Sequence, residues 1–342
     1  MWAVGSNSEG QLGVGDTSDR ASLARCVTVE GGVFPPAGWQ VVRVACTATC
    51  TAVLCRAATQ SAVWLSGRAW DQPTTAFRRM DEVDGVVDVA ATWDCLYVVM
   101  RDQVWAFGTS NTYGQWGAGR DAPPGVWHRV QLPEGVSVRA IAGGVRHCLV
   151  EVDEQGEHVL YGWGQARHGQ LRHVPSTPPH VWYTPVVLHT WPATHTCSLA
   201  LGMHHTVIGV HAQGQTTLIA YGSNRHGQLD LPPEVRQGRW IPTCNWHTTL
   251  LWGGDVIEAH GAQHHGQTLG QGLSCRGAVQ LSSGSEHSAL LRDGTVYAWG
   301  WNEHGNVGGA PREEPGVPPR VLADGAQGVW TGYGTTWVML RA

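Results

Sequence analysis

One short pattern recurs seven times along this chain of 342 residues, and it constrains the fold more than any other feature. In its fullest form an aromatic residue precedes a glycine, and variable residues then lead to Gly-Gln-Leu, as in WAVGSNSEGQLG at 2–13 and IAYGSNRHGQL at 219–229. The first glycines of the copies are Gly5, Gly67, Gly108, Gly164, Gly222, Gly261 and Gly300. Successive copies lie 39 to 62 residues apart, which is near the length of a four-stranded β-propeller blade.

A second pattern precedes every copy except the first. A turn, often followed by histidine, leads into an apolar run, as in GGVRHCLV at 143–150, GMHHTVI at 202–208, NWHTTLL at 245–251 and GSEHSALL at 284–291. The last version, TGYGTTWVML at 331–340, has no glycine copy after it. Because an open array would leave unpaired sheet edges, we expect the strand WAVG at 2–5 to pair with WVML at 337–340. The sequence therefore predicts an all-β, seven-bladed β-propeller in a single domain, 1–342, closed by its N-terminal and C-terminal strands.

The composition fits many short strands and excludes several kinds of chemistry. Glycine occurs 45 times and tryptophan 18 times, while only 14% of residues are charged. The chain has no lysine, which excludes a P-loop lysine, a Schiff-base lysine and a lysine general base. The net charge is −5 and no basic run occurs, so we expect no direct nucleic-acid partner. We also expect no signal peptide, no membrane span or membrane partner, and a cytoplasmic location with the nucleus as a second one.

The repeated residues have structural interpretations. We expect the glycines to permit positive-φ turns, the tryptophans to fill the wedge between blades, and Gly-Gln-Leu to form a turn rather than a phosphate-binding loop. The repeated histidine should bond a backbone group of the neighbouring blade rather than a metal. Three other histidines fall in the variable loop of the repeat: His264, His265 and His304.

The nine cysteines contain no C-x-x-C pair and indicate buried free thiols in a reducing compartment. Cys46, Cys50 and Cys55 would lie on both faces of a strand, which disfavours a zinc site. No nucleophile elbow or zinc-protease motif appears. We therefore expect no catalytic residue, no metal and no cofactor, and a protein that is not an enzyme.

The paired patterns resemble the regulator-of-chromosome-condensation repeat family, whose fold is a seven-bladed β-propeller. GSEHSALL at 284–291, YAWGWNEHGNVG at 297–308 and GYGTTWVML at 332–340 most resemble a small fungal group, the α-tubulin-suppressor or killer-toxin-insensitivity propellers. That resemblance implies a heterodimer with a small CSL-type zinc protein. The zinc protein serves diphthamide synthesis on elongation factor 2 and Elongator-dependent modification of tRNA wobble uridines, with Elongator as an indirect partner. The first half of the chain departs most from the family pattern, notably at the second blade, so the resemblance does not extend to contacts carried by residues 55–85.

Two other functions remain open at this stage. The family includes a guanine-nucleotide exchange factor for a Ran-like small GTPase, although this chain lacks the basic tail of the chromatin-bound type. The repeat also occurs in scaffolds of ubiquitin and trafficking pathways.

Surface loops of the C-terminal blades supply the candidate partner-binding residues, because propellers bind through loops and Trp anchors interfaces well. For Trp246 and Trp301 the alternative is packing between blades, and Trp299 is expected in the core. The candidates are Trp246, His247, Glu286, Trp301, Asn302, Glu303 and His304.

Overall fold

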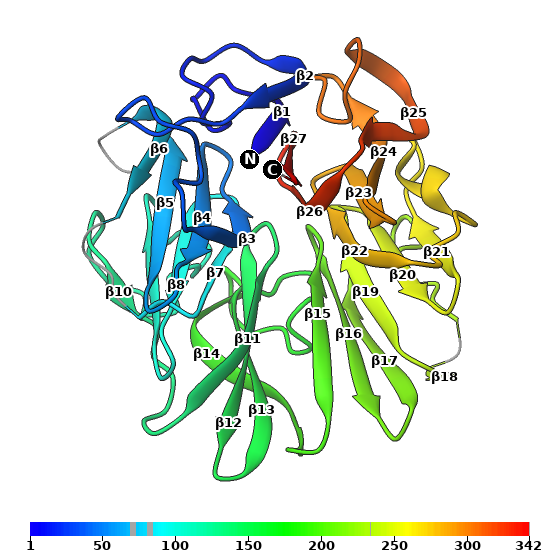
Figure 1. Ribbon diagram of the computed structural model, residues 1–342. Helices are drawn as coiled ribbons and strands as arrows, with labels where there is room; N and C mark the ends of the chain where they lie inside the picture. The colour runs from blue at the N-terminus through cyan, green and yellow to red at the C-terminus, as the bar shows by residue number, and fades with distance from the viewer. Residues whose placement is uncertain (69–72, 81–84, 233, 342) are drawn as a thin grey trace.

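The computed structural model describes residues 1–68, 73–80, 85–232 and 234–341. Its strands form seven antiparallel sheets arranged as blades around a central axis, which confirms the predicted all-β seven-bladed propeller (Figure 1). The described residues contain no α-helix, only a single 3-10 turn, η1 (Gln267–Gly270), and no helix long and apolar enough to cross a membrane.

We number the blades 1 to 7 around the ring and give their strands from the axis outward. Blades 1 to 4 are β26 (Ala326–Thr331), β27 (Thr335–Leu340), β1 (Trp2–Gly5) and β2 (Arg20–Arg25); β3 (Gln40–Cys46), β4 (Cys50–Arg56), β5 (Ser61–Gly67) and β6 (Thr74–Arg79); β7 (Asp88–Ala91), β8 (Cys95–Val99), β9 (Val104–Gly108) and β10 (His128–Arg129); and β11 (Ser137–Gly143), β12 (His147–Glu154), β13 (Glu157–Gln165) and β14 (Val181–Pro192). Blades 5 to 7 are β15 (Thr196–Leu201), β16 (His205–Ala212), β17 (Gln215–Gly222) and β18 (Val235–Gln237); β19 (Trp240–Cys244), β20 (Thr248–Gly253) and β21 (Val256–Gly261); and β22 (Ala278–Ser283), β23 (His287–Arg292), β24 (Thr295–Asn302) and β25 (Arg312–Ala323).

Blade 6 departs from the four-stranded unit that the repeat spacing suggests. Among the described residues it has three strands, and η1 follows its third strand. The loop of the second glycine copy cannot be compared in the same way, because residues 69–72 lie outside the described part of the chain.

The ring closes as the terminal patterns predict. Trp2 of β1 pairs with Val338 of β27, and Gly5 pairs with Thr335. The two chain ends consequently lie beside each other in blade 1 (Figure 1). Trp337 and Val338 are fully buried, so the closing sheet also contributes to the core.

The seven repeat glycines end the third strands and allow a close approach of backbone. Each pairs with the first residue of the second strand in its blade, as Gly164 does with His147 and Gly300 with His287. A Cβ at Gly300 would lie 2.6 Å from the carbonyl oxygen of Glu286, a distance that real side chains do not reach. Six of the seven have positive φ, but Gly108 does not, so the expectation of a positive-φ turn was wrong there. At Gly108 a Cβ would still lie 2.7 Å from the Asp94 carbonyl oxygen.

Large rings fill the boundaries between blades, as expected. Trp163 and Trp299 are fully buried, and their indole N–H groups donate to the carbonyl oxygens of Gln115 (2.8 Å) and Gln267 (3.0 Å) in the preceding blade. The Gln115 side chain caps its own loop, since its Oε1 accepts from the backbone N–H of Tyr113 at 2.8 Å. Gly-Gln-Leu is therefore a turn and packing element.

The repeated histidines join neighbouring blades through hydroxyl groups. Nε2 of His147, His205 and His287 lies 3.0, 3.1 and 2.9 Å from the Oγ1 atoms of Thr206, Thr249 and Thr336, respectively. We call these three contacts the histidine clamps. The predicted partner in the neighbouring blade is confirmed. The predicted backbone acceptor was wrong as the shared partner, because each clamp uses the hydroxyl of the threonine that follows the repeated position in the neighbouring blade. Only His287 also approaches a carbonyl oxygen, that of Thr335 at 3.2 Å.

All nine cysteines are free and seven are buried, which agrees with the prediction of thiols rather than a disulfide framework. Burial raises the pKa of Cys50 and Cys55 to about 12, so neither is a thiolate nucleophile at neutral pH. Among the described residues, no group of three or more His, Cys, Asp or Glu side chains is arranged to hold a metal ion.

Candidate interaction face

One end of the propeller carries all seven tight turns that join the first strand of a blade to its second strand. Together with the loops that follow the third strands, these turns form what we call the turn face. The turns are 47–49, 92–94, 144–146, 202–204, 245–247, 284–286 and 332–334.

Backbone hydrogen bonds connect the turns of successive blades. The N–H of Trp93 donates to the carbonyl oxygen of Val145 (3.0 Å), that of Met203 to Trp246 (2.9 Å), and that of Trp246 to Ser285 (2.8 Å). The side chains on these turns are therefore held on a fixed inner ring.

Three aromatic side chains from distant blades meet at the centre of the turn face. The ring centroids of Trp93 and Trp246 are 5.8 Å apart, those of Trp93 and Tyr333 5.1 Å, and those of Trp246 and Tyr333 6.1 Å. We call these three residues the aromatic trio. Trp93 is 38% exposed, which is unusual for a side chain that packs against two other rings. The trio spans the mouth of the central channel because it joins blades 1, 3 and 6.

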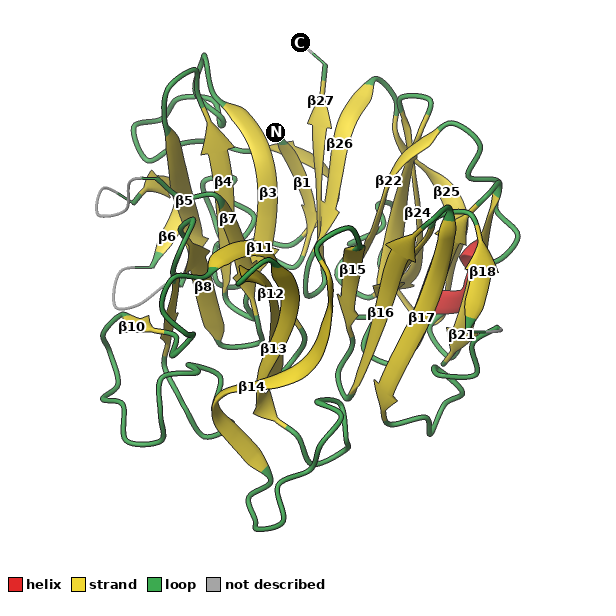
Figure 2. Cartoon of the chain, turned by 90° about the horizontal axis from the view of Figure 1, so that it is seen from below, coloured by secondary structure: helices red, strands yellow, loops and turns green. Residues whose placement is uncertain are grey.

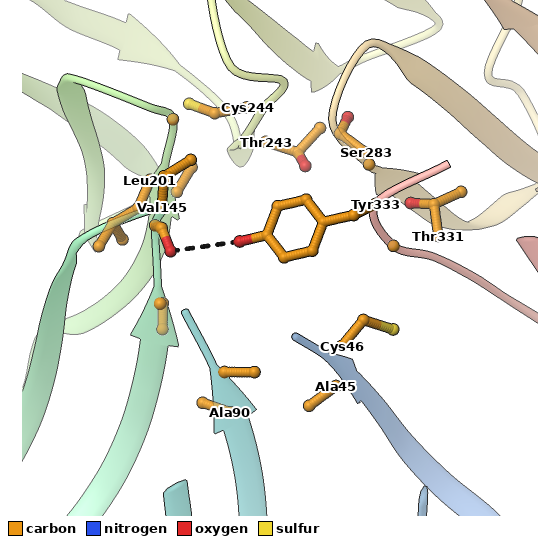
Figure 3. Close-up of a pocket in the computed structure, with 18 of the residues that line it drawn as sticks. Ala45, Cys46, Ala90, Val145, Leu201, Thr243, Cys244, Ser283, Thr331 and Tyr333 are labelled. Carbon is orange, nitrogen blue, oxygen red and sulfur yellow. Dashed lines mark hydrogen bonds between the residues drawn. The ribbon is translucent and has the colours of Figure 1, made fainter. Parts of the chain in front are cut away.

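The channel behind the trio is a small cavity of about 230 Å³ lined by the first strands of the blades and the adjoining turns. Tyr333 points across it, and its hydroxyl lies 3.5 Å from the carbonyl oxygen of Gly144 (Figure 3). Seen from the side, the blades stand around this channel with their strands roughly along the axis (Figure 2).

Two of the predicted site residues, His247 and Glu286, bridge blades 6 and 7. Nδ1 of His247 lies 3.0 Å from Oε1 of Glu286, and Nε2 of Gln267 donates to Oε2 at 2.6 Å. Glu286 is only 8% exposed, so this carboxylate mainly holds the turns together. The repeat position that histidine fills in other blades is Thr248 here, and His247 lies one residue earlier, in the turn.

The end of β24 and the loop that follows it bring Trp301 and His304 to the same face, beside blade 1. Their rings are 5.3 Å apart and nearly perpendicular, and Nδ1 of His304 lies 2.8 Å from Oδ2 of Asp19. Trp301 and Trp246 are half-buried rather than packed in a blade boundary, whereas Trp299 is fully buried as expected. Glu303 is exposed.

Asn302 has a different position from its neighbours, since it is fully buried. Its Nδ2 donates to the carbonyl oxygens of Gly308 and Ala310, and its Oδ1 accepts from the N–H of Val307. We therefore assign Asn302 to the loop's internal structure and do not include it in the candidate surface.

Sequence reasoning missed Trp93, Tyr333 and a row of side-chain contact pairs between adjacent blades. The residue before Gly-Gln in one loop meets the last residue of the next blade's turn: Tyr113 with Arg146, His168 with His204, and His226 with His247. A positional comparison of the two repeat patterns would have revealed this pairing.

These contact pairs lie in a positive local field. Burial, together with the nearby charges of His168, His247, Arg146 and Arg225, lowers the pKa of His204 to about 4. Burial and the charges of Arg225 and Arg167 likewise lower the pKa of His168. Both histidines are therefore neutral at pH 7, and the arginines carry the charge.

Comparisons with known proteins agree with the fold. The family model described as Regulator of chromosome condensation (RCC1) repeat matches residues 278–306. The Ultraviolet-B receptor UVR8 of Arabidopsis thaliana is 28% identical over 89% of this chain and 61% of its own length. Human RCC1 domain-containing protein 1 is 27% identical (58% of this chain, 54% of its own length), and the bovine secretion-regulating guanine nucleotide exchange factor 26% (68% and 60%). The chain thus matches 54–61% of the length of these relatives.

Solved structures show the same architecture. Human WBSCR16 superposes with a TM-score of 0.74 at 17% identity, covering 100% of this chain and 98% of that one. Prp20p from Saccharomyces cerevisiae, described with its binding properties to Gsp1p and histones, gives 0.76 at 15% identity, with coverage of 100% and 91%. These likenesses show the propeller fold.

Proposed function

We propose that this RCC1-like repeat propeller is a non-enzymatic protein-interaction module that binds its partner through the turn face. The observation that carries the proposal is the aromatic trio at the centre of that face, with Trp93 exposed although it packs against two rings. Binding energy in protein interfaces concentrates in aromatic anchors near the centre, surrounded by polar groups that exclude water. His247, Trp301, Glu303 and His304 lie in the turns and loops of the same face and would form part of that rim.

The resemblance of the C-terminal segments favours a small CSL-type zinc protein as the partner, bound as a heterodimer. The module would then support diphthamide synthesis on elongation factor 2 and Elongator-dependent modification of tRNA wobble uridines, with Elongator contacted indirectly. Its location would be the cytoplasm, with the nucleus as a second one. The alternative is guanine-nucleotide exchange on a Ran-like small GTPase, and one relative, the secretion-regulating guanine nucleotide exchange factor, favours it.

Calorimetric titration with the two candidate partners would test the proposal. The protein would be titrated with the CSL-type zinc protein and, separately, with a Ran-like GTPase whose nucleotide release is also followed. We expect one-to-one binding of the zinc protein, weakened about tenfold or more by Trp93→Ala. Trp105→Ala is the control, because Trp105 is a half-buried tryptophan that lies near the opposite end of the same blade, at the start of β9.

The outcomes separate the alternatives. Equal affinity of the wild-type and Trp93→Ala proteins would remove the turn face as the binding site. Accelerated nucleotide release from the GTPase, without binding of the zinc protein, would favour the exchange-factor function.

A second candidate function is absorption of ultraviolet-B light, because indole rings absorb in that range and Trp93 and Trp246 are 5.8 Å apart. The relative UVR8 is an ultraviolet-B receptor. We would compare hydrodynamic size and partner affinity before and after ultraviolet-B irradiation of the wild-type and Trp93→Phe proteins. A light-induced change that the substitution abolishes would support this function, and identical results with and without light would refute it.

A further inference from the structure

Some arginines outside the turn-face sector of blades 4 and 5 pair with carboxylates, whereas others, such as Arg25 and Arg56, have no carboxylate within 4 Å among the described residues. Six described ion pairs join an arginine to a carboxylate: Arg20–Asp16, Arg43–Asp88, Arg68–Glu9, Arg139–Asp153, Arg236–Glu258 and Arg276–Asp255. Three arginines on the turn face have no carboxylate within 4 Å among the described residues. They are Arg146 in the turn 144–146, Arg167 in the loop after β13, and Arg225 in the loop after β17.

These three arginines belong to one continuous sector of the face. Arg146 and His204 occupy the last positions of adjacent turns. The loop that carries Arg167 contacts the second of these turns through His168–His204 (4.1 Å between ring centroids), and the loop that carries Arg225 contacts the following turn through His226–His247 (4.9 Å). The charges of Arg146 and Arg225 both lower the pKa of His204, and those of Arg225 and Arg167 both lower the pKa of His168. The electric fields of the three arginines therefore overlap. We call Arg146, Arg167 and Arg225 the cationic sector.

Arg146 is held in place without being neutralised. The guanidinium carbon of Arg146 lies 3.9 Å from the centroid of the Tyr113 ring, which restrains the side chain and leaves its charge intact. Arg167 and Arg225 are exposed. A guanidinium that is already oriented loses less conformational entropy when it binds a carboxylate.

Two carboxylates limit the extent of the sector. Asp94 borders Arg146 and accepts hydrogen bonds from Nε2 of Gln115 at 2.8 and 2.9 Å. Glu286 lies beyond His247 and is bonded to His247 and Gln267. A ligand with a long run of negative charge would meet these carboxylates at both ends, whereas a short acidic segment would fit between them.

We propose that the cationic sector binds a short Asp- or Glu-rich segment of the partner protein, next to the aromatic trio. This inference rests on the proposed function, and it adds the chemistry of the partner. Guanidinium groups bind carboxylates through paired N–H···O bonds. Each of the three arginines of the cationic sector can form such a pair with an Asp or Glu side chain of the partner. A nucleic acid is a poorer fit, because its phosphate backbone would extend onto Asp94 and Glu286 and the chain's net charge is −5.

Fluorescence-anisotropy titration with a labelled oligoglutamate peptide would test the sector directly, with oligolysine and oligouridylate as comparison probes. We expect oligoglutamate binding that weakens as salt rises from about 0.05 M to about 0.3 M. Replacing all three arginines of the cationic sector by glutamine should weaken it about tenfold or more. The control variant replaces three exposed arginines at the opposite ends of their blades and should bind as wild type does. Those three are Arg25, Arg56 and Arg101.

Oligoglutamate affinity that is unchanged in the cationic-sector variant would overturn the inference, and so would preferential binding of oligouridylate. Measuring the same variants against the partner protein separates the two proposals. Loss of partner binding in Trp93→Ala but not in the arginine variant would leave the proposed function standing and refute the acidic segment. Loss of oligoglutamate binding in the arginine variant, with partner binding unaffected by Trp93→Ala, would support the sector and refute the trio as anchor.

Discussion

Acidification should destabilise this propeller strongly, because the three histidines of the clamps are buried in their neutral form. Burial, together with the charges of neighbouring histidines, lowers the pKa of His147 and His205 to about 3, and burial lowers that of His287 to about 4. The hydrogen-bond geometry at His287 also indicates a neutral imidazole ring. The Thr336 hydroxyl donates to the carbonyl oxygen of Asn306 at 2.7 Å, so Nε2 must be the donor to that hydroxyl. Nδ1 has no partner among the described residues, and protonating it would bury an unpaired cationic N–H.

The size of the effect follows from proton linkage. A histidine in the unfolded chain has a pKa of about 6.5, so the unfolded state binds more protons and stability falls as the pH drops below that value. At about pH 5 each clamp histidine should lower the free energy of unfolding by about 2 kcal/mol, and the three together by about 6 kcal/mol. That loss is comparable to the whole stability of a typical domain. Burial also raises the pKa of Asp88 and Asp94, which has the opposite sign, but carboxyl groups gain protons mainly below about pH 5.

Urea unfolding followed by tryptophan fluorescence, from about pH 7.5 down to about pH 5, would measure this loss. His287→Gln cannot gain a proton and keeps an N–H donor, so it should remove about 2 kcal/mol of the acid-induced loss of stability. His264→Gln is the control, since His264 is exposed in a loop outside the clamps. Stability that stays constant over this range, or a His287→Gln protein with the wild-type slope, would refute neutral burial of the clamps.

Three further predictions concern closure, binding and the repeat glycines. Deleting 331–342 removes β27 and should unfold the whole ring, so an unchanged melting temperature would contradict closure by the terminal strands. Replacing Trp301 and His304 by alanine should weaken partner binding about tenfold with unchanged circular dichroism, and wild-type affinity would remove them from the interface. Gly300→Ala should cost about 3 kcal/mol or more by urea titration, whereas Gly31→Ala, with positive φ but open space around it, should cost about 1 kcal/mol. Equal losses would show that close backbone approach does not explain the repeat.

The sequence predicted the parts of the fold that repeat, because the same contact recurs in every blade. The positions of Gly164 and Gly300, the buried ring of Trp299 and the pairing of 2–5 with 337–340 all follow from comparing copies. The exceptions are local departures from the average repeat. Blade 6 has three strands among its described residues, and Thr248 replaces the clamp histidine, so His247 was assigned to the wrong position.

The candidate site was less predictable, because its residues meet only when the ring closes. Trp93, Trp246 and Tyr333 come from three turns far apart in the chain, and no local pattern indicates that their rings touch. Arg146 and Tyr113 likewise belong to adjacent blades, and they come into contact only when these blades pack together. Asn302 shows the reverse error, since a polar residue in a surface loop was predicted to bind a partner and is instead buried in its own turn.

The pairing of β1 with β27 also has a consequence for biosynthesis. The first strand leaves the ribosome long before Thr335, its partner, has been made. At about 5–20 residues per second, that delay is roughly 20 to 70 s. During this time blades 2 to 7 can form in order, but the edge of β1 that pairs with β27 stays open to other chains. Pairing of β1 with another chain would therefore compete with ring closure until β27 has been made.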